Sequence, residues 1–341
     1  MGDNPDSVRL MRVLIGGGSG FLGTALCRWL EASGHTVTLI STRAGMPPRP
    51  GDSALAKQRA RIHALGGALG AGAVAWEPSA LKRAVATHDA VVNLAGAGLS
   101  GSRWTPAYKK LMEDSRVGTT RMLVEAMARV EAKDRPRCFI GGSAIGCYLP
   151  DESMEYTEDS PLSPAGEGPG SPGADTLSRI VEEWEHEAML ARTLGVRTLV
   201  ARTGVVLGAG GGVLSLLSLP FKWYLGGVAG NGRQWVSWIH LEDHVRLMAF
   251  LLEHPTLSGP VNLTAPQPVR QKVLAQTLGR VLDRPCWLPQ PAPLIRLAMG
   301  EAATLALEGQ RVLPSKALGA GFDFNFPKLD EALENICGKT L

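Results

Sequence analysis

The sequence of 341 residues predicts an α/β fold, in which helices cover both faces of a doubly wound parallel sheet, with a smaller C-terminal lobe. Three observations support this fold class. Short β-branched, apolar runs alternate with stretches of helical periodicity, and the first run leads directly into a glycine-rich turn. The composition, 45% hydrophobic and 20% charged, is sufficient to bury the core of a full α/β domain and an accessory lobe.

The first strand, helix and strand are predicted within residues 12–43. Val13 to Ile15 form a short apolar run that is typical of a buried parallel strand. The pattern becomes helical from Phe21 to Leu30, Gly34 provides a stop, and TVTLI at 36–40 predicts the second strand. This order of elements is a βαβ unit.

Gly17, Gly20 and Gly23 form a G-x-x-G-x-x-G pattern between the first strand and its helix. A tight turn there needs a residue without a Cβ, and glycine lets the backbone approach a pyrophosphate closely. The start of the helix then offers free N–H groups and the positive end of its dipole. The spacing and its context predict a Rossmann-type dinucleotide-binding domain.

The end of the second predicted strand indicates which dinucleotide is bound. An NAD site usually has an Asp or Glu there to accept hydrogen bonds from the ribose 2′-OH, whereas this chain has Ser41, Thr42 and Arg43. A hydroxyl and a guanidinium suit a 2′-phosphate, and no carboxylate is present to repel one. NADP(H) is therefore the expected cofactor; the alternative is that Arg43 is a solvated loop residue.

The next elements continue the alternation. Residues 44–78 are rich in Pro and Gly at both ends, and we interpret about 44–75 as a surface insertion. The apolar strand DAVVNLAGAG at 89–98 ends in small residues that let a dinucleotide lie over the sheet edge. A long amphipathic helix is predicted from about 108 to 130, and it contains Arg116.

Two more strand-like runs follow, RCFIGGSAIGCY at 137–148 and VRTLVARTGVVLG at 196–208. SWIHLEDHVRLMAFLLE, at 237–253, is interpreted as the end of a strand leading into a helix. The rest of the chain contains the helical stretches QKVLAQTLGRVL and PLIRLAMGEAATLALEGQRVL and a final LDEALENI.

From this order we predict two domains. An NADP(H)-binding domain spans 11–208, and a smaller C-terminal lobe spans 209–341, with some of its strands and helices returning to the first domain.

The charge balance and the cysteines exclude several classes of partner and site. With 35 Lys and Arg against 32 Asp and Glu, there is no electrostatic argument for nucleic acid or an anionic membrane as a partner. The five cysteines show no CxxC pairing, so neither a metal site nor a disulfide framework is expected. No apolar stretch reaches the roughly 20 residues that span a bilayer, so no direct membrane insertion is expected. Without an evident targeting segment the expected location is cytoplasmic by default, with a mitochondrial or plastid matrix left open.

The motifs GGGSGFLG, NLAG, GSAIGCY, RTGVVLG and WIHLED together resemble the extended branch of the short-chain dehydrogenase/reductase superfamily. YTEDSPL, GNGRQWVSWIHLEDHV, VNLTAPQPV and LEGQRVLPSKALGAGF narrow the resemblance to atypical, epimerase-like members with their own C-terminal domain. It covers nearly everything from Met11 to Ile336 except the insertion. Members are mostly labelled epimerases or oxidoreductases, some are labelled cell-division-inhibitor-like, and the resemblance implies NADP(H) as the dinucleotide.

The resemblance also implies which residues bind that dinucleotide. Arg116 and Arg202 are expected to reach a cofactor phosphate or its neighbourhood. Because Ser-Thr-Arg stands where a direct Ser-Arg pair is usual, either Thr42 or Arg43 can face the 2′-phosphate. The other expected cofactor-binding residues are Gly17, Gly20, Phe21, Leu22, Ser41, Arg43, Leu94, Ala95 and Gly96.

The helix predicted within 168–188 lacks the acid–base pair of the wider superfamily, in which a Tyr and a Lys four residues later share one helix face. There the lysine lowers the tyrosine pKa from about 10, so that the phenol can exchange a proton with substrate. GPGSPGADTLSRIVEEWEHEA contains neither residue, although the serine of the superfamily is kept as Ser143. Loss of a positioned acid or base typically costs about 10²- to 10⁴-fold in rate, so ordinary alcohol–ketone redox is not expected.

Ser143 and Tyr148 are the catalytic candidates that remain. Tyr148 follows the strand in a turn at the sheet edge, where its phenol can either reach a ligand or pack in the core. Arg179 can hold an acidic substrate, but pairing with Glu182 or Glu183 at helical spacing is the favoured interpretation.

Four further side chains also allow two interpretations. His240 can carry a proton, yet its place before a helix favours a structural role. Cys147 is a nucleophile by chemistry alone, and inert packing is favoured because no His is near it in sequence. Glu158 and Asp159 can line a pocket mouth, with a solvated capping loop as the default.

Two functions remain open. The first is an epimerase or oxidoreductase that binds NADP(H) and acts on an unknown small polar substrate without a Tyr-x-x-x-Lys pair. The second is a catalytically silent NADP(H)-binding accessory or sensor subunit of a larger assembly, organellar or not. A homodimer is also left open, because helices like the one predicted at 108–130 often pair in extended members.

Overall fold

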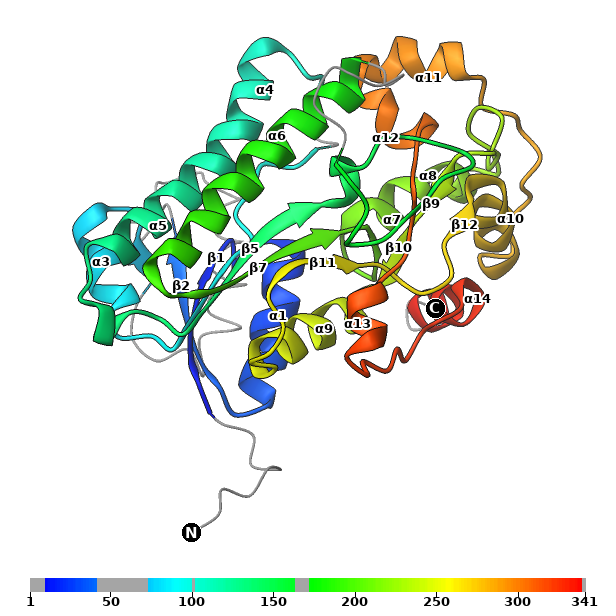
Figure 1. The fold of residues 1–341 in the computed structure, drawn as a ribbon. Helices are drawn as coiled ribbons and strands as arrows, with labels where there is room; N and C mark the ends of the chain where they lie inside the picture. The colour runs from blue at the N-terminus through cyan, green and yellow to red at the C-terminus, as the bar shows by residue number, and fades with distance from the viewer. Residues whose placement is uncertain (1–9, 42–72, 100–101, 163–171, 339–341) are drawn as a thin grey trace, which may run out of the picture.

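The computed structural model describes residues 10–41, 73–99, 102–162 and 172–338. Its centre is a seven-stranded, fully parallel sheet in the order β11-β7-β5-β4-β1-β2-β3 (Figure 1). The predicted α/β fold class is confirmed. The strands are β1 (Arg12–Gly16), β2 (Thr36–Ser41), β3 (Val74–Ala75), β4 (Ala90–Asn93), β5 (Cys138–Ala144), β7 (Arg197–Thr203) and β11 (Gly259–Leu263).

Helices cover both faces of this sheet (Figure 1). Because side chains alternate along a strand, Val13 and Ile15 pack in one core cluster with Leu26 of α1, while Leu14 packs in a second cluster on the opposite face. The first face is covered by α1 (Phe21–Ala32) and α9 (Leu241–Glu253), and the second by α3 (Pro78–Val85), α5 (Thr119–Ala128) and α6 (Pro172–Met189).

The register of the sheet brings the ends of four neighbouring strands to one edge. Gly16 of β1 pairs with Asn93 of β4, and Asn93 pairs with Gly141 of β5. Two residues further along, Ser143 pairs with Arg202 of β7. Open α/β sheets bind their ligands at this carboxyl edge.

Two predicted continuous elements are interrupted. The helix expected from 108 to 130 consists of α4 (Pro106–Glu113), a π-helical turn (Asp114–Gly118) and α5. The run expected as one strand at 196–208 is divided at Gly204 into β7 and β8 (Val205–Leu207). A Cβ at residue 204 would collide with the Ser237 carbonyl oxygen, so glycine is required where β8 leaves the main sheet.

Outside the main sheet lie three two-stranded sheets, β10-β8, β12-β9 and β13-β6, and two of their strands, β6 and β8, come from residues before 209. The expected helix at PLIRLAMGEAATLALEGQRVL is instead two short helices joined by a 3-10 turn at Gly300–Ala303, because Gly300 (φ 60°) ends the first of them. The strands are β6 (Glu155–Tyr156), β9 (Trp235–Val236), β10 (Trp238–His240), β12 (Val269–Arg270) and β13 (Arg311–Val312). The helices are α7 (Gly212–Leu217), α8 (Leu219–Lys222), α10 (Gln271–Val281), α11 (Ala292–Met299), α12 (Thr304–Leu307), α13 (Ser315–Gly319) and α14 (Leu329–Gly338). Short 3-10 turns lie at Ala132–Asp134, Ile145–Cys147 and Leu190–Leu194.

The second half of the chain also completes the first domain. Helix α9 packs its buried face against α1, and β11 is the edge strand beside β7. Across the described ranges, none of the helices has the length and apolar character needed to cross a membrane.

Candidate functional site

The glycine turn between β1 and α1 packs directly on the loop that follows β4. Gly17 has φ 76°, in the left-handed region that favours glycine. A Cβ on Gly17 would lie 2.5 Å from the backbone carbon and oxygen of Leu94 and 2.6 Å from the Ala95 nitrogen. The Leu94 N–H donates to the Gly16 carbonyl oxygen at 2.8 Å. Residue 17 therefore has no space for a side chain, and its backbone packs directly on the Leu94 backbone.

The same turn leaves the start of α1 without a side-chain cap. Gly20 is the N-cap residue, and its own N–H donates to the Gly17 carbonyl oxygen at 3.0 Å. Gly23, in the first turn of α1, packs against the backbone of Gly17 and Gly18. The backbone N–H groups of this first turn and the helix dipole are thus available to an anion.

The half-buried Phe21 fixes the loop that follows β8. Cβ atoms on Gly211 or Gly212 would lie 2.8 Å from its ring, so this loop can approach α1 only with glycine at those positions. Leu22 is half-buried against the core beneath the turn. Both residues thus lie beside the uncapped N–H groups.

Arg116 reaches the same edge from the π-helical turn. Its guanidinium donates to the carbonyl oxygens of Met112 at 3.1 Å and Ala97 at 2.8 Å, and its Cζ lies 5.6 Å from the centroid of the Trp184 ring. A Cβ on Gly96 would be 3.1 Å from that Cζ. Burial lowers the pKa of Arg116 to about 10.

Within the described part of the chain, Arg116 forms no ion pair with a carboxylate. A half-buried cation that donates hydrogen bonds to carbonyl oxygens but has no carboxylate partner is suited to binding an anion.

Of the residues expected to select the 2′-phosphate, Ser41 is the last residue of β2, next to β1 in the sheet. Thr42, Arg43 and nearly all of the predicted insertion at 44–75 lie outside the described residues.

A buried ion pair lies behind Ser143. The carboxylate of Glu185, on α6, accepts hydrogen bonds from the Arg202 Nε and Nη2 atoms, both at 2.8 Å. It also accepts one from the Ser143 hydroxyl at 2.5 Å. The exposed fractions of the three residues are 8%, 4% and 4%. Burial lowers the pKa of Arg202, but the hydrogen bonds and charge of Glu185, together with Cys147 and Tyr148, outweigh this effect and the pKa is raised overall.

Tyr148 extends this network into the C-terminal half of the molecule. Its hydroxyl accepts a hydrogen bond from Arg202 Nη1 at 2.8 Å and lies 2.9 Å from Asn262 Oδ1 and 3.0 Å from the Thr157 carbonyl oxygen. Burial raises the pKa of Tyr148 to about 12, and the residue is 1% exposed. These contacts favour packing of the phenol over contact with a ligand.

The expectation that Arg202 reaches a cofactor phosphate or its neighbourhood stays a prediction. The Arg202 guanidinium donates to Glu185 and Tyr148, because a buried cation requires a counter-charge and hydrogen-bond acceptors where it lies.

Glu185 is the main residue that the sequence interpretation missed. Trp184 and Ala188 of the same helix are buried, so Glu185 lies on a face that packs against the sheet. A carboxylate on such a face signals a partner of opposite charge.

Two other candidates have structural roles. Arg179 forms ion pairs with Glu113 and Glu183, both at 3.1 Å, which confirms the surface-pair interpretation. The Nδ1 atom of His240 accepts a hydrogen bond from the Glu242 N–H at 3.1 Å, so His240 caps α9.

The remaining candidates are also held by the fold. Cys147 is 2% exposed, and burial raises the pKa of its thiol well above the ordinary value. Glu158 is buried and accepts hydrogen bonds from the backbone N–H groups of Asn262 and Lys316 at 2.9 and 3.2 Å. Glu158 thus joins its loop to β11 and α13, while Asp159 is exposed.

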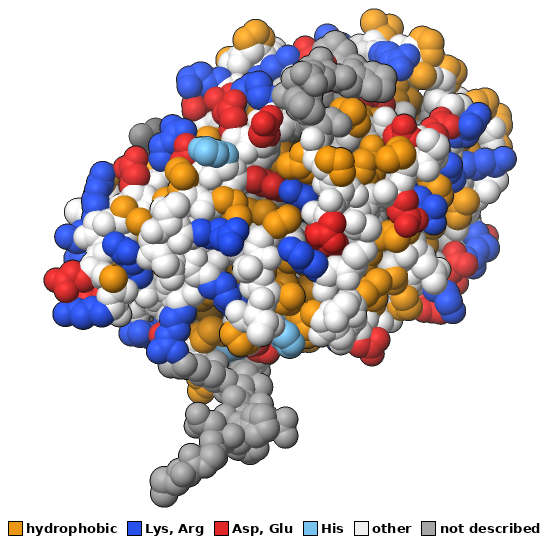
Figure 2. Space-filling model, viewed as in Figure 1, with side chains coloured by type: hydrophobic (Ala, Val, Ile, Leu, Met, Phe, Trp, Pro, Cys, Tyr) orange, Lys and Arg blue, Asp and Glu red, His pale blue; other side chains and the backbone are white. Residues whose placement is uncertain are grey.

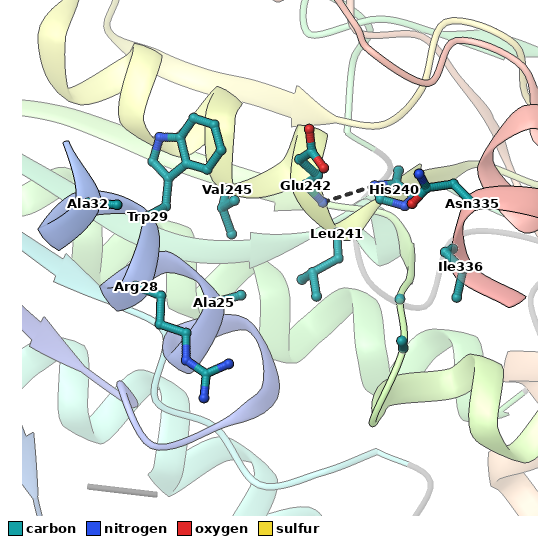
Figure 3. A pocket seen from close by; sticks show the side chains of 12 residues that line it. Ala25, Arg28, Trp29, Ala32, His240, Leu241, Glu242, Val245, Asn335 and Ile336 are labelled. Atoms are coloured by element: carbon teal, nitrogen blue, oxygen red, sulfur yellow. Dashed lines mark hydrogen bonds between the residues drawn. The ribbon is translucent and has the colours of Figure 1, made fainter. Parts of the chain in front are cut away.

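A pocket of about 410 Å³ opens elsewhere, between α1, α9 and α14 (Figure 3). Its walls include Trp29, Leu241 and Ile336 together with His240, whereas the expected cofactor-binding residues, Ser143 and Tyr148 do not line it. The described residues contain no group of three or more His, Cys, Asp or Glu that could hold a metal ion.

Comparison with known protein families identifies two matching regions. The NAD dependent epimerase/dehydratase family matches residues 13–263. A domain of unknown function, DUF1731, matches residues 290–336.

Similar proteins occur in bacteria, plants and humans. Epimerase family protein YfhF of Bacillus subtilis is 35% identical over 328 residues, which cover 96% of this chain and 98% of that protein. The chloroplastic SDR39U1 homolog of Arabidopsis thaliana is 36% identical over 327 residues, which cover 96% of this chain and 86% of that protein. The crystal structure of human epimerase family protein SDR39U1 (isoform 2) with NADPH has a TM-score of 0.78 and 33% identity, and covers 96% of this chain and 99% of that one. The chain described here belongs to the NAD dependent epimerase/dehydratase family.

Proposed function

We propose that this protein binds NADP(H) at the carboxyl edge of β1 and β4 and acts as an epimerase or oxidoreductase on a small polar substrate. One observation carries the cofactor assignment: Arg116, without a carboxylate partner among the described residues, lies at the same sheet edge as the uncapped start of α1. Human SDR39U1, similar along nearly its whole length, was crystallised with NADPH.

The residues present fit a dinucleotide in its usual place. The backbone from Gly17 to Leu22 would hold the pyrophosphate, and Leu94 to Gly96 would form the opposite wall. Arg116 would contribute the positive charge, and Ser41 with Thr42 or Arg43 would hold the 2′-phosphate. When bound, the nicotinamide supplies a hydride donor or acceptor.

Beside the nicotinamide ring, this chain would have fewer side chains that can transfer protons than members of the wider superfamily have. Helix α6 contains neither Tyr nor Lys, and the Ser143 hydroxyl donates a hydrogen bond to Glu185. Burial raises the pKa of Tyr148 to about 12, from an ordinary value of about 10, so its phenol is a weaker acid than an exposed tyrosine. The proposed activity therefore works without a Tyr-x-x-x-Lys pair, and Ser143 takes part through the lone pairs of its oxygen.

The same contacts favour a second candidate, a catalytically silent NADP(H)-binding accessory or sensor subunit. Both candidate catalytic residues, Ser143 and Tyr148, are engaged in buried hydrogen bonds. Turnover of bound NADPH across a panel of carbonyl compounds and nucleotide sugars separates the two. Turnover at ordinary enzyme rates eliminates the silent subunit, while co-purification with a large complex without turnover eliminates the enzyme.

The cofactor assignment is tested separately. The purified protein is denatured, and the released small molecules are identified by mass spectrometry. Titration with NADPH and NADH then gives both dissociation constants for the native protein and for Arg116→Met. We expect tighter binding of NADPH and a weaker complex in the variant. If no dinucleotide is released and NADPH does not bind, the assignment is wrong.

A further inference from the structure

Two sequence segments of the C-terminal lobe have an excess of basic residues, although two of these residues, Arg233 and Arg280, pair with carboxylates from outside the segments. Residues 209–241 contain no Asp or Glu, and residues 254–300 contain only Asp283. The net charge of the whole chain does not show this excess of basic residues, because the remaining residues include more Asp and Glu than Lys and Arg. The cations of the two segments are Lys222, Arg233, Arg270, Lys272, Arg280, Arg284 and Arg296.

The same lobe has a surface that we call the aromatic patch: Trp223, Tyr224, Leu225 and Trp287. Their exposed fractions are 73%, 56%, 49% and 63%. Such values are unusual for large apolar side chains that lie side by side, and exposed apolar patches generally mark interaction sites.

The local fold holds these side chains together. The turn after α8 is closed by N–H groups of Trp223 and Leu225, which donate to the Pro220 carbonyl oxygen at 3.1 and 2.9 Å. Trp287 joins this turn from the segment after α10, since its indole N–H donates to the Tyr224 carbonyl oxygen at 3.0 Å. Tyr224 has φ 60°, a left-handed conformation that bulky residues rarely adopt. The patch is therefore a fixed feature of the fold.

Two cations flank the aromatic patch. Lys222 immediately precedes it and is exposed, and the Cζ of Arg284 lies 4.8 Å from the centroid of the Tyr224 ring. Neither side chain is within ion-pair distance of a carboxylate in the part of the chain that the structure describes.

Helix α11, in the same lobe, combines the same two properties. It buries none of its residues, Leu294 and Leu297 are 62% and 74% exposed, and Arg296 lies between them in sequence. Figure 2 shows hydrophobic side chains gathered over α11 at the upper right, with Lys and Arg side chains beside them. The lobe thus presents apolar and cationic groups together at two places.

We propose that the aromatic patch docks on the surface of a lipid bilayer that contains anionic lipids. Trp and Tyr are favoured at membrane interfaces because their rings are apolar and their tips are polar, and adjacent cations are attracted to anionic headgroups. Trp223 projects from the surface. A lipid bilayer can deform around a projecting side chain, whereas a folded protein partner would need a pocket that matches it. Docking requires no spanning helix, since interfacial attachment uses only buried apolar area and charge.

The test is co-sedimentation of the full chain with vesicles. We expect binding to vesicles of phosphatidylcholine that contain phosphatidylglycerol, little binding to pure phosphatidylcholine, and loss of binding as salt is raised. Neutralising one flanking cation, as in Lys222→Gln, should lower the partition coefficient about fivefold. Trp223→Ser should lower it about tenfold. Leu111→Ser and Lys133→Gln, which change exposed residues of the first domain, are the matched controls and should bind like the native chain.

The unfolding temperature of each variant is measured as well, so that weaker vesicle binding can be distinguished from unfolding of the variant. The proposal is overturned if the native chain does not bind anionic vesicles, or if the patch and control variants bind them equally. It is also overturned if sedimentation velocity shows a dimer that Trp223→Ser dissociates while vesicle binding is absent, since the patch would then join two copies of the chain. Binding of NADPH is not part of this test, so its outcome does not depend on the cofactor proposal.

Discussion

Glu185→Ala removes the carboxylate on which the buried network behind Ser143 depends. Arg202 would stay in a site where its side chain is 4% exposed, with no remaining counter-charge, and Ser143 would lose its hydrogen-bond acceptor. Breaking one partner of a buried pair typically costs about 3–5 kcal/mol. That is a large fraction of the roughly 5–15 kcal/mol by which most domains are stable.

The measurement is equilibrium unfolding in urea, followed by circular dichroism in the absence of added dinucleotide. Glu187→Ala is the matched control: it lies on the same helix and pairs with Arg121, and the side chains of Glu187 and Arg121 are 14% and 54% exposed. Because this pair reaches solvent through Arg121, it should contribute less than the buried pair, and the control should lose less stability. The double variant Glu185→Leu with Arg202→Met should recover much of the loss, because apolar residues can replace a buried pair.

Two results would refute this reasoning. One is a loss in Glu185→Ala no larger than that in Glu187→Ala. The other is an Arg202→Met variant that unfolds like the native chain but binds NADPH at least tenfold more weakly. In that case Arg202 would serve the cofactor, as the family resemblance implies, and its bond to Glu185 would be incidental.

Three further predictions concern the sheet edge and the core. Gly17→Ala should both weaken NADPH binding and lower the unfolding temperature. Residue 17 has φ 76°, and a Cβ there would lie 2.5 Å from the Leu94 backbone. A variant with the native dissociation constant and the native unfolding temperature would contradict this prediction. Arg116→Met should weaken NADPH binding by about 1.5–3 kcal/mol, the usual contribution of a charged hydrogen bond, and should reduce its salt dependence; an unchanged dissociation constant would exclude a phosphate contact. Burial lowers the pKa of His244 to about 4, against about 6.5 in the unfolded chain, so protons bind preferentially to the unfolded state. The free energy of unfolding should therefore fall by about 3 kcal/mol as pH drops from about 6.5 to 4. In His244→Leu, the urea midpoint of unfolding should depend less on pH over this range. An equally steep fall in the variant would assign the pH dependence to other groups.

The fold could be predicted largely from sequence because its first unit is local. The strand from Val13, the glycine turn and the helix from Phe21 follow one another within a few residues, and each has its own signal. The interruptions could not be predicted. The π-helical turn at Asp114–Gly118 preserves helical periodicity, and the break at Gly204 depends on a carbonyl of Ser237, distant in sequence.

The candidate site also has a part that could be predicted from sequence and a part that could not. Gly17 and its neighbours are determined by a turn whose requirements are local, so spacing alone indicates them. Arg202 comes from a largely apolar strand, which indicates that its charge is buried, whereas Glu185 comes from an amphipathic helix with several other carboxylates. Which buried charges meet is decided by tertiary packing, and sequence alone leaves Arg202 free to face a phosphate instead.

The position of β11 has a consequence for synthesis of the chain. The sheet that carries the proposed cofactor site ends in β7 until residues 259–263 have been added, and β7 then presents unpaired backbone groups at an open edge. The Rossmann-type half therefore cannot complete its hydrogen bonding while the ribosome is still translating the first 258 residues. During that interval the open edge of β7 is available for pairing with a second copy of the chain. A fragment ending at residue 208 would retain the glycine turn permanently beside an unfinished sheet.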